Sequence, residues 1–200
     1  MRTFIAIDLP AAVKQEMRAL QRRLQNDLRP IGGDRLFKWT NPDKVHVTLR
    51  FLGETSDTQV DQIHADLRRI TADAIPFALN LDGIGVFPNW PRVRVLWAGV
   101  SGELAALHRL QQAVETAAQA AGFVAEDKSF SPHITLARTS NDARSEQIRR
   151  TGEFLRAWSA QQRAGGGAEW RVHEIVHMQS QLRPAGAVYT ALAHYSLGYQ

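Results

Sequence analysis

Two copies of one short pattern restrict the folds open to this chain. His46-Val47-Thr48-Leu49 in the first half returns as His133-Ile134-Thr135-Leu136 in the second half, in each case a histidine, an apolar β-branched residue, a threonine and a leucine. The order of strands and helices expected around the pattern repeats as well. We therefore expect two similar lobes related by a pseudo-twofold axis, with both copies of the pattern facing one groove.

The first half alternates strands with helices. Apolar, β-branched runs bounded by turn residues predict strands, and apolar residues at helical spacing predict helices. The expected strands are Arg2–Leu9, Leu36–Trp39, Val45–Leu52 and Phe77–Val86, and the expected helices are Ala11–Leu28 and Asp57–Ala72. Asp82-Gly83 predicts a bulge or bend in the fourth strand.

The second half repeats this order. The expected strands are Val93–Val100, Ser131–Arg138, Trp170–Leu182 and Val188–Leu197, and the expected helices are Glu103–Ala121 and Asp142–Trp158. The glycine run Gly165–Gly167 predicts a flexible loop, because no Lys-Ser or Lys-Thr pair and no helix signal follow it as a phosphate-binding loop would require.

These elements predict an α+β fold. The strands lack the long apolar runs of a parallel sheet, so each lobe is expected to hold a mostly antiparallel sheet with helices packed on its outer face. A length of 200 residues suits a single domain, residues 1–200, whose two lobes share a central groove.

Composition excludes several classes of protein. The chain has no cysteine, which rules out disulfide scaffolds, thiolate metal sites and cysteine nucleophiles. No run approaches 18 uncharged apolar residues, so we expect a soluble, cytoplasmic protein. The net charge of +4 mildly favours an anionic partner but is equally typical of an ordinary soluble surface.

The repeated pattern carries groups suited to acid–base chemistry. Alternate side chains of a strand share a face, so His46 and Thr48 are expected to lie roughly 7 Å apart on one face, as are His133 and Thr135. A single such pair would more simply occupy a solvent-facing strand, but two equivalent copies favour a site. One neutral imidazole can act as general base and one protonated imidazole as general acid, on opposite sides of a phosphorus atom.

Two arginines follow the pattern. By strand alternation Arg50 is expected to face the groove with His46 and Thr48. Arg138 has the opposite parity from His133, so it reaches the groove only if its strand bends or ends there.

Several segments resemble the 2H phosphoesterase superfamily, and within it the RNA 2′,3′-cyclic phosphodiesterases, also called 2′-5′ RNA ligases. The resemblance rests on Phe4–Pro10, Phe37–Pro42, His46–Gly53, Val95–Val100 and Ser131–Arg138. It implies a bilobal fold and hydrolysis of RNA terminal 2′,3′-cyclic phosphate to a 2′-phosphomonoester, without metal or other cofactor, together with reversible 2′-5′ ligation.

The resemblance also implies roles for single residues. His46 corresponds to the proton donor and His133 to the proton acceptor, while Thr48, Thr135 and Arg138 correspond to phosphate-binding positions. The expected partner is an RNA or oligonucleotide 3′ end bearing the cyclic phosphate, with no membrane association, and we expect a monomer.

Two other functions stay open at this point. His173-Glu174-Ile175-Val176-His177 fits the zinc-peptidase pattern H-E-x-x-H, but that pattern needs a helix, and alternation here favours a strand. His173 and His177 are then expected on the sheet surface, or lining the groove. A non-catalytic RNA-binding module is the other alternative, with Phe37, Trp39, Phe51, Trp90 and Trp97 as candidate stacking rings, although strand patterns place most of them in the core.

Overall fold

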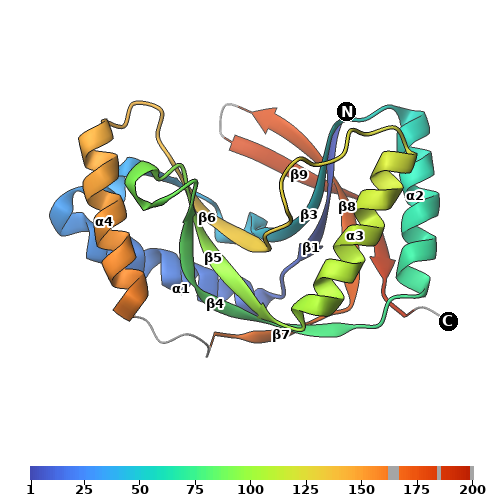
Figure 1. Cartoon of the computed structure of the whole chain (residues 1–200), viewed down its shortest axis with the longest axis horizontal. Helices are drawn as coiled ribbons and strands as arrows, with labels where there is room; N and C mark the ends of the chain where they lie inside the picture. Colours follow the sequence, from blue (N-terminus) through green and yellow to red (C-terminus); the bar gives the residue numbers. More distant parts are fainter. Residues whose placement is uncertain (162–166, 184–185, 199–200) are drawn as a thin grey trace.

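The computed structural model describes residues 1–161, 167–183 and 186–198 and shows an α+β fold built on one curled antiparallel sheet (Figure 1). Within these residues the strands are β1 (Arg2–Asp8), β2 (Phe37–Trp39), β3 (His46–Glu54), β4 (Phe77–Phe87), β5 (Val95–Gly102), β6 (His133–Thr139), β7 (Glu169–Val172), β8 (Glu174–Arg183) and β9 (Gly186–Ser196). The α-helices are α1 (Ala11–Leu28), α2 (Asp57–Ala72), α3 (Leu104–Ala120) and α4 (Ser145–Gln161).

The sheet has the pseudo-twofold symmetry that the repeat predicts. Its strand order is β7-β4-β5-β6-β3-β1-β8-β9, with β2 beside β6. The order reads as two four-stranded halves that meet where β6 pairs with β3, through Val47 and Ile134. The apolar residue of each pattern copy therefore forms the seam between the lobes, and the two histidines lie on either side of it.

The lobes exchange a helix. The helices α2 and α3 pack beside each other on the β3-β1-β8-β9 half, while α1 and α4 flank the β4-β5-β6 half (Figure 1). The helix α1 follows β1 in the chain, yet the amide of its buried Gln21 donates hydrogen bonds to the carbonyls of Thr40 and Leu136, the latter in β6. The connection from each half thus crosses to the other, which ties the two lobes into one core.

Amphipathic helices close that core. The buried side chains of α1 are spaced three or four residues apart, and those of α3 follow the same spacing with Ala117 and Ala118 adjacent, which places each set on one face. They are Val13, Met17, Gln21, Leu24 and Leu28 in α1 and Leu107, Leu110, Val114, Ala117 and Ala118 in α3. Among the described helices, none has the length and apolar character that a membrane span needs.

Most of the expected elements are confirmed, and one expected strand is wrong. The stretch Trp170–Leu182 forms two strands that are separated at His173, because the pairing partner changes there. Before His173, β7 pairs with β4; after it, β8 pairs with β1. The prediction for Gly165–Gly167 lies outside the described residues except for Gly167.

The expectation that His177 lies on the sheet surface or in the groove is also wrong. His177 is completely buried in β8, and its ring lies 5.3 Å from that of His64, which is in turn 5.9 Å from Tyr195. Neither ring nitrogen of His177 has a hydrogen-bond partner among the described residues. Burial and the nearby His64 therefore lower the pKa of His177 to about 4.

The buried His177 makes stability depend on pH. The pKa of His177 in the folded chain lies below the ordinary 6.5. As pH falls below 6.5, His177 therefore binds a proton in the unfolded chain while it stays neutral in the folded chain. We expect the free energy of unfolding to fall between pH 7.5 and pH 5 by roughly 2 kcal/mol more in the wild type than in His177→Leu. Urea unfolding at both pH values measures this difference. The control is the exposed His173, because His173→Leu should keep the wild-type pH dependence of stability. Equal pH dependence in all three proteins would contradict the role of the buried His177.

Candidate active site

The two copies of the pattern meet in one groove at the seam of the sheet. The cavity has a volume of about 140 Å³ and is lined by Thr40, Lys44, Val45, His46, Thr48, Phe51, His133, Thr135, Arg138 and Tyr189. The structure therefore brings together all five residues singled out from the sequence, His46, Thr48, His133, Thr135 and Arg138, although the sequence left the position of Arg138 open.

A β-bulge in each pattern strand decides which way the residues beyond the threonine face. In β3, Thr48 pairs with Ala6 and Arg50 with Ile5, which leaves Leu49 as the extra residue. In β6, Thr135 pairs with Trp97 and Ala137 with Leu96, which leaves Leu136 extra at the equivalent place. One additional residue reverses the alternation, so the position five residues after each histidine faces the groove.

The bulges explain why Arg138 lines the groove and Arg50 does not, the reverse of what strand alternation predicts. Arg138 lies five residues after His133 and lines the groove, where unbroken alternation would have turned it away. The expectation that Arg50 faces the groove is wrong: its side chain is only 6% exposed, and Phe51, which is 56% exposed, takes the groove-facing position. Phe51 is likewise an exception to the expectation that most candidate stacking rings lie in the core.

Each histidine is held in a single tautomer. The Nδ1 atom of His46 lies 3.0 Å from the carbonyl oxygen of Lys44, and that of His133 lies 2.8 Å from the carbonyl oxygen of Ser131. A carbonyl oxygen only accepts, so each Nδ1 carries the proton and donates it. Each Nε2 is therefore left either to accept a proton, when the ring is neutral, or to donate one, when the ring is charged.

Burial shifts the acid–base balance of both rings. Desolvation lowers the pKa of His46, opposed by the Lys44 carbonyl and by the charge of Asp8, while His133 and Lys14 lower it further. Desolvation also lowers the pKa of His133; the Ser131 carbonyl opposes this, and the positive charge of Arg138 adds to it. Both imidazoles are thus mainly neutral at pH 7, a state in which Nε2 can accept a proton.

Aromatic rings supply that desolvation on both sides. The centroid of the His46 ring lies 4.8 Å from that of Phe4 and 5.3 Å from that of Tyr189. The His133 ring lies 4.9 Å from that of Phe87 and 6.2 Å from that of Trp97. A methyl group at Gly85 would overlap the Trp97 ring, so glycine in β4 lets this ring lie against the strand beside His133.

The groove is suited to an anion. Lys44 and Arg138 are the lysine and the arginine among its lining residues, and no aspartate or glutamate is among the described residues that line it. Thr40, Thr48, Thr135 and Tyr189 add hydroxyl groups. Sequence reasoning did not select Thr40, Lys44 or Tyr189. Thr40 and Lys44 lie in the short connection before β3, close in sequence to His46, whereas nothing in the sequence brings the distant Tyr189 to this site.

Arg50 instead joins β3 to the segment that leads into β6. Its guanidinium lies 2.6 Å from a carboxylate oxygen of Glu115 in α3 and 2.7 Å from one of Glu126, and it donates to the carbonyls of Phe51 and Val124. The first bulge thus turns the Arg50 cation away from the groove to a position where the carboxylates of Glu115 and Glu126 and two backbone carbonyls contact it.

The H-E-x-x-H sequence does not form a metal site. His173 lies between β7 and β8 and is exposed, whereas His177 lies buried in β8 with its ring beside that of His64. The segment is thus not helical, with Glu174–His177 in a strand and His173 between two strands, and the two rings do not share a helical face as a zinc peptidase requires. Neither of them lines the groove.

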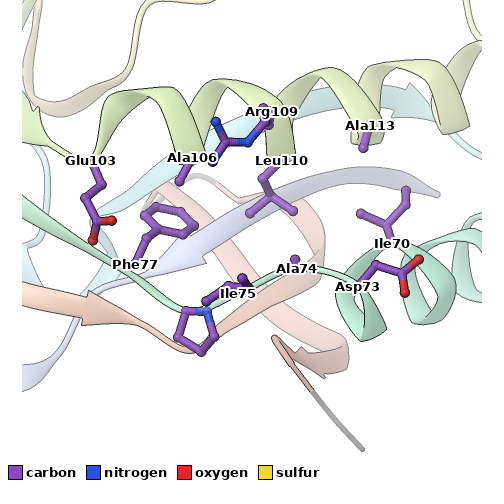
Figure 2. A pocket seen from close by; sticks show the side chains of 11 residues that line it. Ile70, Asp73, Ala74, Ile75, Phe77, Glu103, Ala106, Arg109, Leu110 and Ala113 are labelled. Carbon is purple, nitrogen blue, oxygen red and sulfur yellow. The ribbon is translucent and has the colours of Figure 1, made fainter.

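A larger cavity of about 400 Å³, whose lining does not include His46 or His133, lies between the C-terminal end of α2 and α3 (Figure 2). Its walls are mostly apolar, with Ile70, Phe77 and Leu110 on the inside and the charged side chains of Asp73, Glu103 and Arg109 around them. The absence of histidine from its lining separates it from the acid–base groups described above.

Comparison with known proteins matches the chain over almost its whole length. The family model described as LigT like Phosphoesterase matches twice, over residues 7–97 and 99–189, with one copy of the histidine pattern in each match. The RNA 2′,3′-cyclic phosphodiesterase of Aquifex aeolicus is 30% identical over 199 residues, which are 99% of this chain and 98% of that protein.

Solved structures are similar over the same extent. The crystal structure of TT0787 of Thermus thermophilus superposes with a TM-score of 0.73 at 32% sequence identity, covering 99% of this chain and 98% of that one. The crystal structure of E. coli LigT complexed with 3′-AMP gives a TM-score of 0.75 at 26% identity, with 99% and 98% covered.

The buried position of Arg50 predicts a large cost of substitution. Arg50→Met leaves the mostly buried carboxylate of Glu115 without its cation, so we expect the free energy of unfolding to fall by roughly 1–3 kcal/mol. Arg149 in α4 is the matched control, because it also pairs with two glutamates, Glu146 and Glu153, but on the exposed surface. Arg149→Met should change stability little, since water screens exposed pairs. Urea unfolding at pH 7.5 compares the two; equal losses would contradict the buried-cluster account.

Proposed function

The chain belongs to the LigT-like phosphoesterase family, and on that premise we propose that it hydrolyses the terminal 2′,3′-cyclic phosphate of RNA to a 2′-phosphomonoester. The observation that carries the proposal is the pair of imidazoles that line one groove, with each Nδ1 occupied by a backbone carbonyl and each Nε2 left for proton transfer. The absence of carboxylates from the described lining favours an anionic substrate.

The proposed reaction is an in-line displacement at phosphorus. The Nε2 of neutral His133 takes a proton from water as the water oxygen bonds to phosphorus. The bond from phosphorus to the 3′ oxygen breaks on the opposite side, and the Nε2 of protonated His46 gives its proton to that oxygen. The products are a 2′-phosphate and a 3′-hydroxyl, and the proton count balances because one histidine gains the proton that the other loses.

The threonine hydroxyls and Arg138 are suited to the charge that develops on the phosphate. Thr48 and Thr135 lie two residues after the histidines on the same strand faces, where their hydroxyls can donate to non-bridging oxygens. Arg138 can add charge-assisted hydrogen bonds. If an RNA 5′-hydroxyl takes the place of water, the same displacement forms a 2′-5′ linkage, which is the proposed ligation.

Local charges favour this assignment of acid and base. Asp8 pairs with His46 across β1 and β3 and raises its pKa, which favours the protonated form that an acid requires. Lys14, which lies 2.8 Å from Asp8, weakens that effect. Arg138 lowers the pKa of His133, which favours the neutral form that a base requires. A carboxylate thus acts on His46, partly offset by Lys14, and a guanidinium acts on His133.

Replacing either histidine should abolish most turnover. With a 2′,3′-cyclic nucleotide as substrate and a chelator in excess, His46→Ala and His133→Ala should each lower kcat by on the order of 100-fold or more, because each removes one proton-transfer group. Phosphorus NMR identifies the 2′-phosphomonoester. His173→Ala should keep wild-type turnover. Full activity in either groove variant would refute the paired mechanism, and binding without turnover in the wild type would favour an RNA-binding module.

The pH profile of the free enzyme follows from the two histidines. One ring must be charged and the other neutral, so kcat/KM should be bell-shaped with its maximum between their two pKa values. Burial lowers both values below 6.5, so the maximum should lie on the acid side of pH 6.5. Initial rates at substrate concentrations well below KM, from pH 4.5 to 8.5, measure the profile; a maximum above pH 7 would contradict these environments.

A further inference from the structure

Two cations face each other across strands β2 and β6 beside the groove. Lys38 is the register partner of Arg138, and directly opposed residues of an antiparallel pair project from the same face. Both side chains are exposed, and neither forms an ion pair or a side-chain hydrogen bond with the residues that the structure describes. Like charges directly opposite each other destabilise a sheet, so this pairing carries a cost that an anionic ligand would remove.

The pair continues the groove. Arg138 already lines the cavity that holds the histidines, and Thr40, two residues after Lys38, lines it as well. Lys38 has no place in that cavity lining, so it extends the positive surface beyond the histidines along β2. An oligonucleotide whose terminal phosphate lies at His46 and His133 carries its next phosphate outside the cavity, where Arg138 and Lys38 continue the positive surface.

We propose that Lys38, together with Arg138, binds the internucleotide phosphate that precedes the terminal nucleotide. This inference rests on the proposed function and names its substrate class: oligonucleotides with a charged linkage before the cyclic phosphate, in preference to cyclic mononucleotides. Lys38 provides affinity as a point charge, since a lysine ammonium holds a phosphate without the planar fork of arginine. The contribution should weaken as salt rises, because the site is exposed.

The test compares two dinucleotides that end in the same 2′,3′-cyclic phosphate. One has a phosphodiester linkage and the other a neutral methylphosphonate linkage, so they differ in the charge that Lys38 would bind. At low salt we expect the wild type to prefer the charged dinucleotide by roughly five- to tenfold in kcat/KM, and Lys38→Ala to reduce that ratio toward one. Arg109→Ala is the matched control, because it removes an exposed cation in α3 near the other cavity, and it should keep the wild-type ratio.

Each outcome decides the inference. A wild type with equal kcat/KM for the two linkages, or a Lys38→Ala variant that keeps the full preference, would overturn it while leaving hydrolysis intact. No turnover of any cyclic phosphate would refute the proposed function instead. In that case the same ratio is measured from the dissociation constants of dinucleotides ending in a 3′-phosphate, and a preference for the charged linkage that Lys38→Ala removes would still support the subsite.

Discussion

Strand alternation interrupted by one extra residue governs the groove. In β3 and in β6 the histidine and the threonine follow ordinary alternation, and then Leu49 or Leu136 adds a residue that no neighbour pairs. Without the bulges, Arg50 would face the groove and Arg138 would enter the core. The carbonyl of Leu136, the extra residue of the second bulge, accepts hydrogen bonds from the buried Gln21 amide and from the backbone N–H of Thr40. Its hydrogen-bonding capacity is thus met by α1 and by the segment after β2.

Each histidine is the first residue of its strand, and this position leaves a backbone carbonyl free to bind its ring. A residue inside the ladder has its preceding carbonyls occupied by neighbouring strands, whereas Lys44 and Ser131 lie just before β3 and β6. Their carbonyl oxygens are therefore available to the ring Nδ1 atoms. Aromatic neighbours from other elements limit the access of water to the rings. The tautomer of each ring thus follows from where the pattern begins relative to the strand.

Much of this could be predicted from the sequence, because it depends on local periodicity. The bounds of α1 and α2 agree residue for residue with the apolar spacing, and the paired histidines follow from the repeat. The features that could not be predicted depend on pairing between distant segments. The bulges appear only when β3 is registered against β1 and β6 against β5, and the break at His173 appears only because β7 and β8 join different halves. The burial of His177 follows from the same crossing, since alternation cannot say whether the other face of a strand meets water or a helix.

The two halves of the groove have similar backbones, but residues at equivalent positions differ in charge. Five residues after the first histidine stands Phe51, and five residues after the second stands Arg138, so one equivalent position supplies an apolar ring and the other a cation. The strand beside His46 brings Asp8, whereas the equivalent partner of His133 in β5 is Gly99. Two identical imidazole environments would titrate alike, so neither ring would be favoured as the acid or as the base. The duplicated fold places the two imidazoles as the proposed in-line displacement requires, and the residues at these few symmetry-related positions supply the difference in charge.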